Sequence, residues 1–188
     1  MKFGITVSQI NEVDLVVQAE NAGYDFCWVW DSPMIRSNLW ALLALVAERT
    51  SRISIGPGVA IPALSMAPVT ANAIATINAI APGRTFLGVG TGNTALRAMG
   101  QVPMTIQALE AQLKVIRGLL AGETVAYEAN GINEDIAFQS LELGCINLDD
   151  PIPIHISGFG PKAQALAGEY GDGLITGIPR GGTIPNAL

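Results

Sequence analysis

The sequence predicts an α/β fold built around a parallel sheet. Short apolar runs alternate along the 188 residues with longer segments of helical period, which is typical of consecutive βαβ units. Apolar residues make up 49% of the chain and charged residues 14%, enough apolar material for one globular domain with a sizeable core. Because no linker, repeat or low-complexity tract divides the chain, we expect a single domain over residues 1–188.

Six runs have the length and composition of buried strands. They are Phe3–Val7, Phe26–Trp30, Ile53–Val59, Thr85–Val89, Ile152–Ser157 and Gly173–Thr176. Helical period and end signals predict five helices between them. These are Glu12–Ala22, Asn38–Arg49, Pro68–Ile80, Thr105–Leu120 and Pro161–Tyr170. Residues 123–138 break the alternation, because they have period two on both sides of the turn-forming Asn130 and Gly131, so we predict a hairpin inserted before the fifth strand.

Two architectures fit six such units. One is a (β/α)8 barrel of the TIM type that is incomplete, and the other is an open doubly wound sheet. A complete barrel usually needs about 250 residues, so this chain is short by roughly two units. The mean hydropathy of +0.39 is high for a monomer and indicates apolar surface that a missing element or a partner would cover. We therefore expect a homodimer or a larger homo-oligomer.

Composition excludes several classes of function. The net charge is −6, the pI is near 4.6, and the ten Lys and Arg residues are scattered singly, which argues against nucleic-acid binding. We expect no membrane association and a cytoplasmic protein, because no cationic leader precedes an apolar run and the apolar run at residues 39–47 is too short to cross a bilayer. Cys27 and Cys145 lack metal-ligand or CxxC spacing, so we interpret them as reduced, mostly buried thiols.

The residue types give no complete catalytic set, so no catalytic residue is assigned. The single histidine, His155, lies inside an apolar strand, and such a residue is more often part of the core than of a catalytic triad. No cluster has the spacing of metal ligands. Asp31 is the one carboxylate that follows a strand directly, although it could equally be a helix cap or a structural acceptor. An enzyme of this composition would depend on an organic cofactor for the difficult chemistry.

Two glycine-rich stretches fit a phosphorylated cofactor. In GVGTGNT, residues 88–94, backbone N–H groups can approach a ligand closely, and hydroxyl and amide side chains follow. SGFGPKA, residues 157–163, opens a helix whose first turn holds Pro161 and whose positive end would face an anion. The dinucleotide fingerprint is not met, because the final GxxG spacing and the acidic residue about 20 positions later are missing.

Four stretches in order carry a resemblance to a known family. They are residues 28–33 (WVWDSP), 43–62 (LALVAERTSRISIGPGVAIP), 75–100 (ATINAIAPGRTFLGVGTGNTALRAMG) and 153–175 (PIHISGFGPKAQALAGEYGDGLI). Together they resemble the bacterial luciferase-like superfamily of monooxygenases and reductases, and most of all its methylenetetrahydromethanopterin reductase branch. That branch uses the deazaflavin coenzyme F420, or FMN in close relatives. The match runs in register from Met1 to about Thr176.

The resemblance implies a TIM-barrel oxidoreductase with an insertion before the fifth strand and a flavin or deazaflavin site. It also implies a bulge with a non-prolyl cis peptide after the third strand, which would back the cofactor ring. The implied cofactor-binding residues are Gly58 and Val59 at that bulge, Asp31, Thr91 and Asn93 around the ring, and Ser157, Gly158, Phe159 and Gly160 around the phosphate.

Two departures from the family pattern leave alternatives open. Relatives often have Asn, Pro and an Arg-His pair after the third strand, where this sequence reads AIPALSMAP, residues 60–68. Relatives also continue for more than a hundred residues after the sixth unit, so the C-terminal barrel units are expected to be missing here. We expect hydride transfer between F420 or FMN and a small organic substrate. The alternatives are a shortened flavin or F420 carrier without catalysis, an inactive fragment, and a half-barrel that binds nothing.

Overall fold

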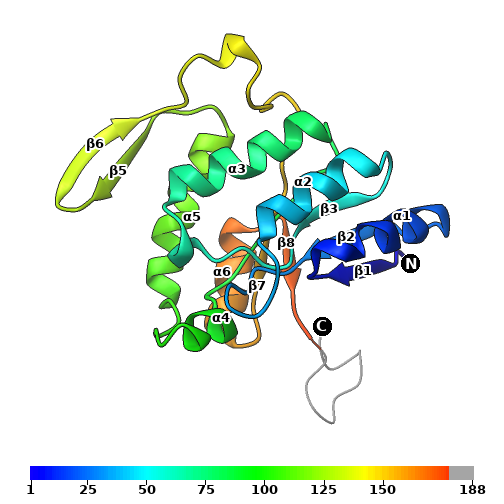
Figure 1. Ribbon diagram of the computed structural model, residues 1–188. Helices are drawn as coiled ribbons and strands as arrows, with labels where there is room; N and C mark the ends of the chain where they lie inside the picture. The colour runs from blue at the N-terminus through cyan, green and yellow to red at the C-terminus, as the bar shows by residue number, and fades with distance from the viewer. Residues whose placement is uncertain (178–188) are drawn as a thin grey trace.

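The computed structural model describes residues 1–177 and contains all six predicted strands and all five predicted helices (Figure 1). The predicted strands extend one to three residues too far at one or both ends, and one short helix, α4, was not predicted. The strands are β1 (Gly4–Val7), β2 (Phe26–Val29), β3 (Ser54–Pro57), β4 (Leu87–Val89), β5 (Val125–Ala129), β6 (Ile132–Ile136), β7 (Ile154–Ser157) and β8 (Gly173–Ile175). The α-helices are α1 (Val13–Asn21), α2 (Leu39–Arg49), α3 (Ala67–Ile80), α4 (Asn93–Ala98), α5 (Ile106–Leu120) and α6 (Pro161–Tyr170).

The order of the strands decides between the two predicted architectures. Parallel pairing gives the orders β1-β2-β3 and β4-β7-β8, and the isolated parallel bridges Ile55–Thr85 and Ala60–Val89 connect β3 to the segment of β4. Strand order therefore follows chain order, as in a barrel wall, whereas a doubly wound sheet reverses direction at a switch point. Within residues 1–177 no pairing joins β8 back to β1, so the barrel is incomplete.

The outer face of the sheet holds the main core. Alternate strand residues point toward the helices, since successive side chains of a strand lie on opposite faces. They pack with the buried faces of α2, α3 and α5, and the strand residues of this cluster include Cys27, Val29, Ile55, Leu87, Ile154 and Ile156. The apolar positions of the helices recur at helical spacing, which explains why each helix covers the sheet with one side.

The inner face of the sheet is filled by aromatic rings. Phe26 stacks on Trp28 with ring centroids 5.4 Å apart, and Phe86 stacks on His155 at 4.9 Å. Glycines of neighbouring strands leave the space that these rings occupy: a Cβ on Gly173 would lie 2.8 Å from Cδ2 of His155. His155 is half-buried, and burial lowers its pKa while the nearby Asp172 opposes that shift. These contacts agree with its interpretation as a residue of the barrel core.

A buried glutamate and a half-buried arginine connect the helices to the amino ends of the strands. Oε1 of Glu20 accepts hydrogen bonds from the backbone N–H groups of residues 51, 52 and 53, at 2.7–2.9 Å. Arg84 donates to the carbonyl oxygens of Ala47, Thr50 and Ile53 at 2.8–3.0 Å. The first set fixes the turn that leads into β3, and the second set satisfies carbonyls at the end of α2 and in the turn that follows it.

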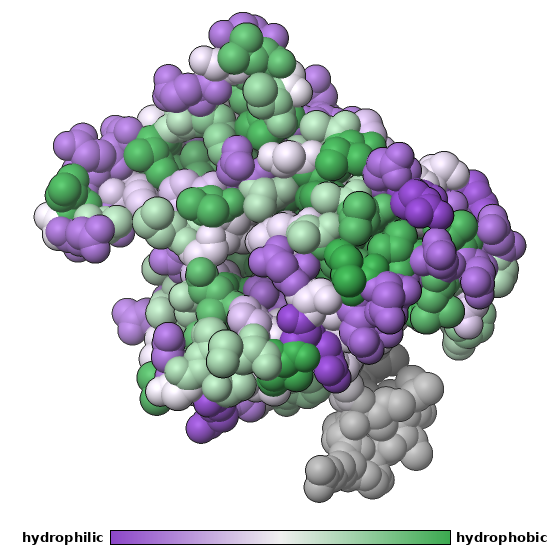
Figure 2. Space-filling model, in the orientation of Figure 1, coloured by the Kyte–Doolittle hydropathy of each residue, from purple (hydrophilic) through white to green (hydrophobic). Residues whose placement is uncertain are grey.

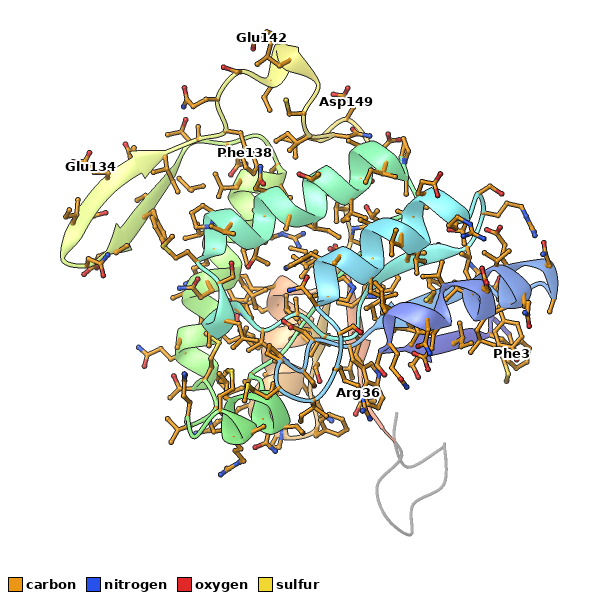
Figure 3. All side chains as sticks on the ribbon, viewed as in Figure 1. Phe3, Arg36, Glu134, Phe138, Glu142 and Asp149 are labelled. Carbon is orange, nitrogen blue, oxygen red and sulfur yellow. The ribbon has the colours of Figure 1, made fainter. Side chains whose placement is uncertain are left out.

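The predicted hairpin is confirmed as β5 and β6, which project away from the rest of the molecule (Figure 1). Asn130 and Gly131 both have positive φ, at 55° and 77°, as a tight two-residue turn requires. Apolar residues of the hairpin and of the segment after it, among them Tyr127 and Phe138, pack against the main core. Figure 3 shows Phe138 near the base of the hairpin and Glu134 on the projecting part.

The surface carries apolar residues as well as charges. Helix α3 has no charged residue, and Leu45 of α2 and Val69 and Ile80 of α3 are exposed. Apolar residues accordingly lie across the middle of the face shown in Figure 2. Among residues 1–177 no helix is long and apolar enough to cross a membrane. Cys27 is buried, whereas Cys145 is exposed on the loop before β7, which corrects the expectation that both thiols are mostly buried.

Candidate functional site

A cavity of about 840 Å³ lies at the carboxyl ends of the parallel strands. Its walls come from the segments that follow β2, β3, β4 and β7 and from the start of α5. Eight of the nine residues that sequence reasoning selected line it, namely Asp31, Gly58, Val59, Thr91, Asn93, Ser157, Phe159 and Gly160. Parallel strands present their carboxyl ends at one edge, which explains why segments far apart in sequence, such as those of Asp31, Gly58, Thr91 and Gly160, meet here.

Asp31 is the carboxylate of this cavity. It follows β2, and its Oδ2 accepts a hydrogen bond of 3.2 Å from the backbone N–H of Ile61. Burial raises the pKa of Asp31 to about 6, although the Ile61 N–H opposes the shift. Asp31 is not a helix cap, since α2 is capped by Asn38, whose Oδ1 accepts from the N–H of Ala41 at 3.1 Å. Asp31 is a structural acceptor through Oδ2 alone, since that oxygen accepts the backbone N–H of Ile61.

The wall of the cavity after β3 is formed by the backbone at Gly58, which has no side chain. The peptide between Gly58 and Val59 is cis, as the resemblance implies. A Cβ on Gly58 would lie 2.6 Å from Cβ of Trp28, and one on Gly90 would lie 2.7 Å from Cγ2 of Val59. Glycine is thus required on both sides of this wall, because any larger residue would displace the aromatic core or the bulge.

The stretch GVGTGNT forms the turn between β4 and α4. Gly92 has φ +74°, and a Cβ there would lie 2.5 Å from Cγ2 of Ile61. Asn93 begins α4, and its Oδ1 accepts from Nε of Arg97 at 2.8 Å. The carbonyl of Thr91 accepts from the N–H of Met104, so the chain folds back after α4 and brings Pro103 and Ile106 to the cavity.

The stretch SGFGPKA forms the opposite wall and the start of α6. Gly160 caps the ten-residue helix, Pro161 occupies its first turn, and a Cβ on Gly160 would meet nothing within 4 Å. Phe159 is 74% exposed at this wall. Gly158 is the predicted residue that does not line the cavity: a Cβ on it would lie 3.0 Å from the backbone carbonyl carbon of Ala163, and its N–H donates to the carbonyl of Ile175.

Several lining residues were not selected from the sequence. They are Trp30, Ser32, Ile61, Gly90, Gly92, Thr94, Ala95, Pro103, Ile106, Pro161, Lys162 and Ala163. Lys162 and Ser32 lie inside the stretches SGFGPKA and WVWDSP, so the sequence pattern could have identified both as lining residues. No sequence signal placed Pro103 and Ile106 at the cavity, since they reach it only through the reversal of the chain after α4.

The arrangement suits an organic ligand with one anionic group. The walls combine glycine backbone and apolar side chains with a few hydroxyl and amide groups, which is typical of ligand pockets of this size. The first turn of α6, with Lys162, offers N–H groups and a positive charge to a phosphate. No group of three potential metal ligands exists among the described residues.

Comparison with known proteins gives a consistent set of matches. The family model described as luciferase-like monooxygenase matches residues 7–183. A 5,10-methylenetetrahydromethanopterin reductase of Archaeoglobus fulgidus is 34% identical over 183 residues, which cover 93% of this chain and 52% of that protein. The chain therefore spans about half the length of this curated relative.

Solved structures agree in fold. The coenzyme F420-dependent tetrahydromethanopterin reductase of Methanopyrus kandleri matches with a TM-score of 0.75 and 25% identity, over 93% of this chain and 55% of that one. An F420-dependent secondary alcohol dehydrogenase, solved with an F420-acetone adduct, matches with a TM-score of 0.77 and 25% identity, over 93% and 57% of the two chains. Together with the strand order, these matches assign the fold to an incomplete TIM-type barrel.

Proposed function

Because this chain belongs to the luciferase-like monooxygenase family, we propose that its cavity binds a phosphorylated flavin-type cofactor, coenzyme F420 or FMN. With that cofactor it acts as an oxidoreductase that transfers a hydride between the cofactor and a small organic molecule. The observation that carries the proposal is the meeting of eight selected residues from four separate segments at one cavity.

The ring site of this proposal lies between the wall after β3 and the turn after β4. Gly58 and Val59 offer a backbone surface that Trp28 supports from behind, so a flat tricyclic ring can rest on it. Thr91 and Asn93, on the turn after β4, offer hydroxyl and amide groups to the ring. When bound, the cofactor supplies the hydride chemistry, and the protein supplies support, orientation and exclusion of water.

The phosphate site of this proposal lies at the start of α6. Ser157 and Gly160 border it, and Lys162 adds a cation that sequence reasoning had not assigned. The positive end of a ten-residue helix and the ammonium group act on the same anion, which supports this end of the cavity over the turn after β4 as the phosphate site. Gly158, one position behind the wall, is proposed to hold the turn in shape through its bond to Ile175.

A second candidate is a carrier that binds the cofactor without turnover. Such a carrier needs the ring site and the phosphate site of the cavity and no catalytic side chain. The homo-oligomer, the cytoplasmic location and the single domain over residues 1–188 stay predictions. Exposed apolar residues on α2 and α3 support the oligomer, since uncovered apolar helix faces are unusual in a monomer.

Fluorescence titration of the 188-residue chain with FMN and with F420 tests the proposal. Micromolar or tighter binding of one cofactor is the expected result. Gly160→Leu should weaken that binding at least about 30-fold, roughly 2 kcal/mol, because its side chain extends into the cavity without disturbing the fold. The matched control is Gly168→Leu, on the same helix with open space around it. Equal affinities of the two variants, or no binding by the folded wild type, would contradict the proposed site.

A further inference from the structure

We propose that Asp31 is the acid–base catalytic residue of this cavity, the group that gives a proton to the substrate, or takes one from it, as the hydride moves. This inference rests on the proposed function, since it needs the ring of the cofactor and the substrate to share the cavity with Asp31. It goes further than cofactor binding, because it assigns a chemical step to one side chain.

The first argument is the way in which Asp31 is held. The N–H of Ile61 fixes Oδ2, which leaves Oδ1 with no hydrogen-bond partner among the described residues while the side chain lines the cavity. The carboxylates at the other end of the sheet are different, since those of Glu20 and Asp172 receive several hydrogen bonds from the protein itself. Asp31 is thus oriented by the protein and has one oxygen available to a ligand.

The second argument concerns the other groups of the cavity. Within residues 1–177 its ionisable lining groups are Asp31 and Lys162, and Lys162 lies on α6 at the proposed phosphate site. The hydroxyl and amide side chains of the lining can donate hydrogen bonds, but they do not exchange protons readily near neutral pH. Asp31 is therefore the lining group suited to general acid–base catalysis.

The third argument concerns the charged residues on the segments that follow β1 and β2. Arg36, on the loop after β2 (Figure 3), lies over the ring of Trp30 at 5.6 Å and donates to the carbonyl of Ile35. Glu12, after β1, accepts from the N–H groups of Ser8 and Gln9. Neither forms an ion pair or hydrogen bond with Asp31, so its carboxyl is not held permanently ionised, and its pKa of about 6 is close to the operating range of a proton donor.

The proposed step reduces a C=O or C=N group of the substrate. The carbon accepts a hydride, which carries two electrons, from the reduced flavin-type cofactor. The π electrons of the double bond move to the oxygen or nitrogen, and that atom forms a bond to the proton of Asp31 as the O–H bond of the carboxyl breaks. Asp31 is left as a carboxylate and regains a proton from water. Substrate oxidation runs through the same step in reverse, with the carboxylate as the base.

The first experiment measures proton uptake rather than turnover. FMN or F420 is added to the full chain at pH 6 in weak buffer with a pH indicator, for the wild type and for Asp31→Asn, which keeps the size and the acceptor for Ile61. Wild-type binding should take up a measurable fraction of a proton, since a ring beside the carboxyl excludes water and raises its pKa further. Asp31→Asn should bind within about threefold of wild type and take up at least fivefold less. Equal uptake by both chains would overturn the inference. The matched control is Asp135→Asn on the exposed hairpin strand β6.

The second experiment measures single-turnover oxidation of the reduced cofactor by acetone, cyclohexanone and cyclohex-2-enone. Asp31→Asn should slow the reaction about 100-fold, at the lower end of the usual range for general acid catalysis. The wild-type rate should fall as the pH rises above about 6, and the rate of the variant should not. A variant rate within threefold of wild type, or no oxidation by any of the three probes, would remove the catalytic role.

A third measurement separates this inference from the proposed function. The carboxyl of Asp31 is titrated by carbon NMR in the chain without cofactor, with Asp31→Asn assigning the signal. A pKa near 6 supports a proton-exchanging group in the cavity even if neither cofactor binds, in which case the proposed function alone fails. A pKa near 4 overturns the inference whether or not a cofactor binds.

Discussion

The two ends of the parallel sheet use their buried polar groups differently. At the amino ends, Glu20 accepts three backbone N–H bonds and Arg84 donates to three backbone carbonyls. At the carboxyl ends, Asp31 accepts one bond of 3.2 Å, and glycine backbone replaces side chains along the walls. Burial opposes ionisation of Glu20, but the three N–H donors outweigh it and lower the pKa of Glu20, while the pKa of Asp31 rises to about 6.

This difference shows which buried charges stabilise the fold and which remain available to a ligand. A carboxylate whose hydrogen bonds are supplied by the protein contributes to stability. One that is half-buried with a single donor is less stable as an ion, and the protein keeps it at a cost in folding free energy. In barrels of this type the chemistry gathers at the carboxyl ends and stability at the amino ends, in agreement with the two environments.

The largest expected effect is at the amino ends. Glu20→Ala should destabilise the protein by about 3 kcal/mol, because three backbone N–H groups lose their acceptor. Urea unfolding measures this loss, and the cofactor affinity of the folded fraction should stay unchanged. Glu48→Ala, an exposed residue of α2, is the matched control and should change stability by less than about 0.5 kcal/mol. A Glu20→Ala protein as stable as this control would break the comparison.

An intermediate effect is expected at the carboxyl ends, on binding rather than on folding. Asp31→Ala should weaken FMN or F420 binding about tenfold, roughly 1.4 kcal/mol, since it removes a polar group that faces the ring site. The midpoint of urea unfolding should move little, because the side chain makes one hydrogen bond. The proposed binding role of Asp31 is wrong if affinity is unchanged or if the fold collapses.

The smallest expected effect is on the pH dependence of the free energy of unfolding. The pKa of Asp31 is higher in the folded state, about 6, than its ordinary 3.8, so its stabilising contribution is complete below pH 3.8 and is lost as the pH rises through 6. Asp31→Asn avoids this loss and should be about 1 kcal/mol more stable than wild type at pH 7.5, a value reduced for partial exposure to the cavity, with no such gain at pH 3.5. A gain of the same size at both pH values would show that ionisation is not its cause.

Much of the fold could be predicted because local signals and tertiary packing agree. The hairpin is an example, since Asn130 and Gly131 allow only a tight turn and the period-two residues on either side then pair in register. Helix α4 could not be predicted in this way. Glycines dominate the stretch before it, and its six residues form a helix where Leu96 packs with Ile61 of the loop after β3, a contact that no local pattern encodes.

Lining residues of the cavity could be predicted where they directly follow a strand. Gly58, Val59 and Thr91 follow that rule, because the end of a strand fixes its own position. Pro103 and Ile106 reach the cavity through the reversal of the chain after α4, and Lys162 depends on how the first turn of α6 is oriented. Gly158 was selected because it lies in a glycine-rich motif, but the motif does not reveal that this residue packs against the backbone of Ala163 instead of lining the cavity.

The aromatic residues on the inner face of the sheet also bear on the kinetics of ligand exchange. Trp28, Phe86 and His155 fill the interior directly beneath the cavity, and glycines on the facing strands leave them no spare room. Within residues 1–177 these side chains close the path from the cavity toward the amino ends, so two ligands that share the cavity exchange on its carboxyl side or past the unpaired edges of β1 and β8. Where both ligands exchange on the carboxyl side, the one that lies deeper binds first and leaves last, so the aromatic floor of the barrel sets the order of binding.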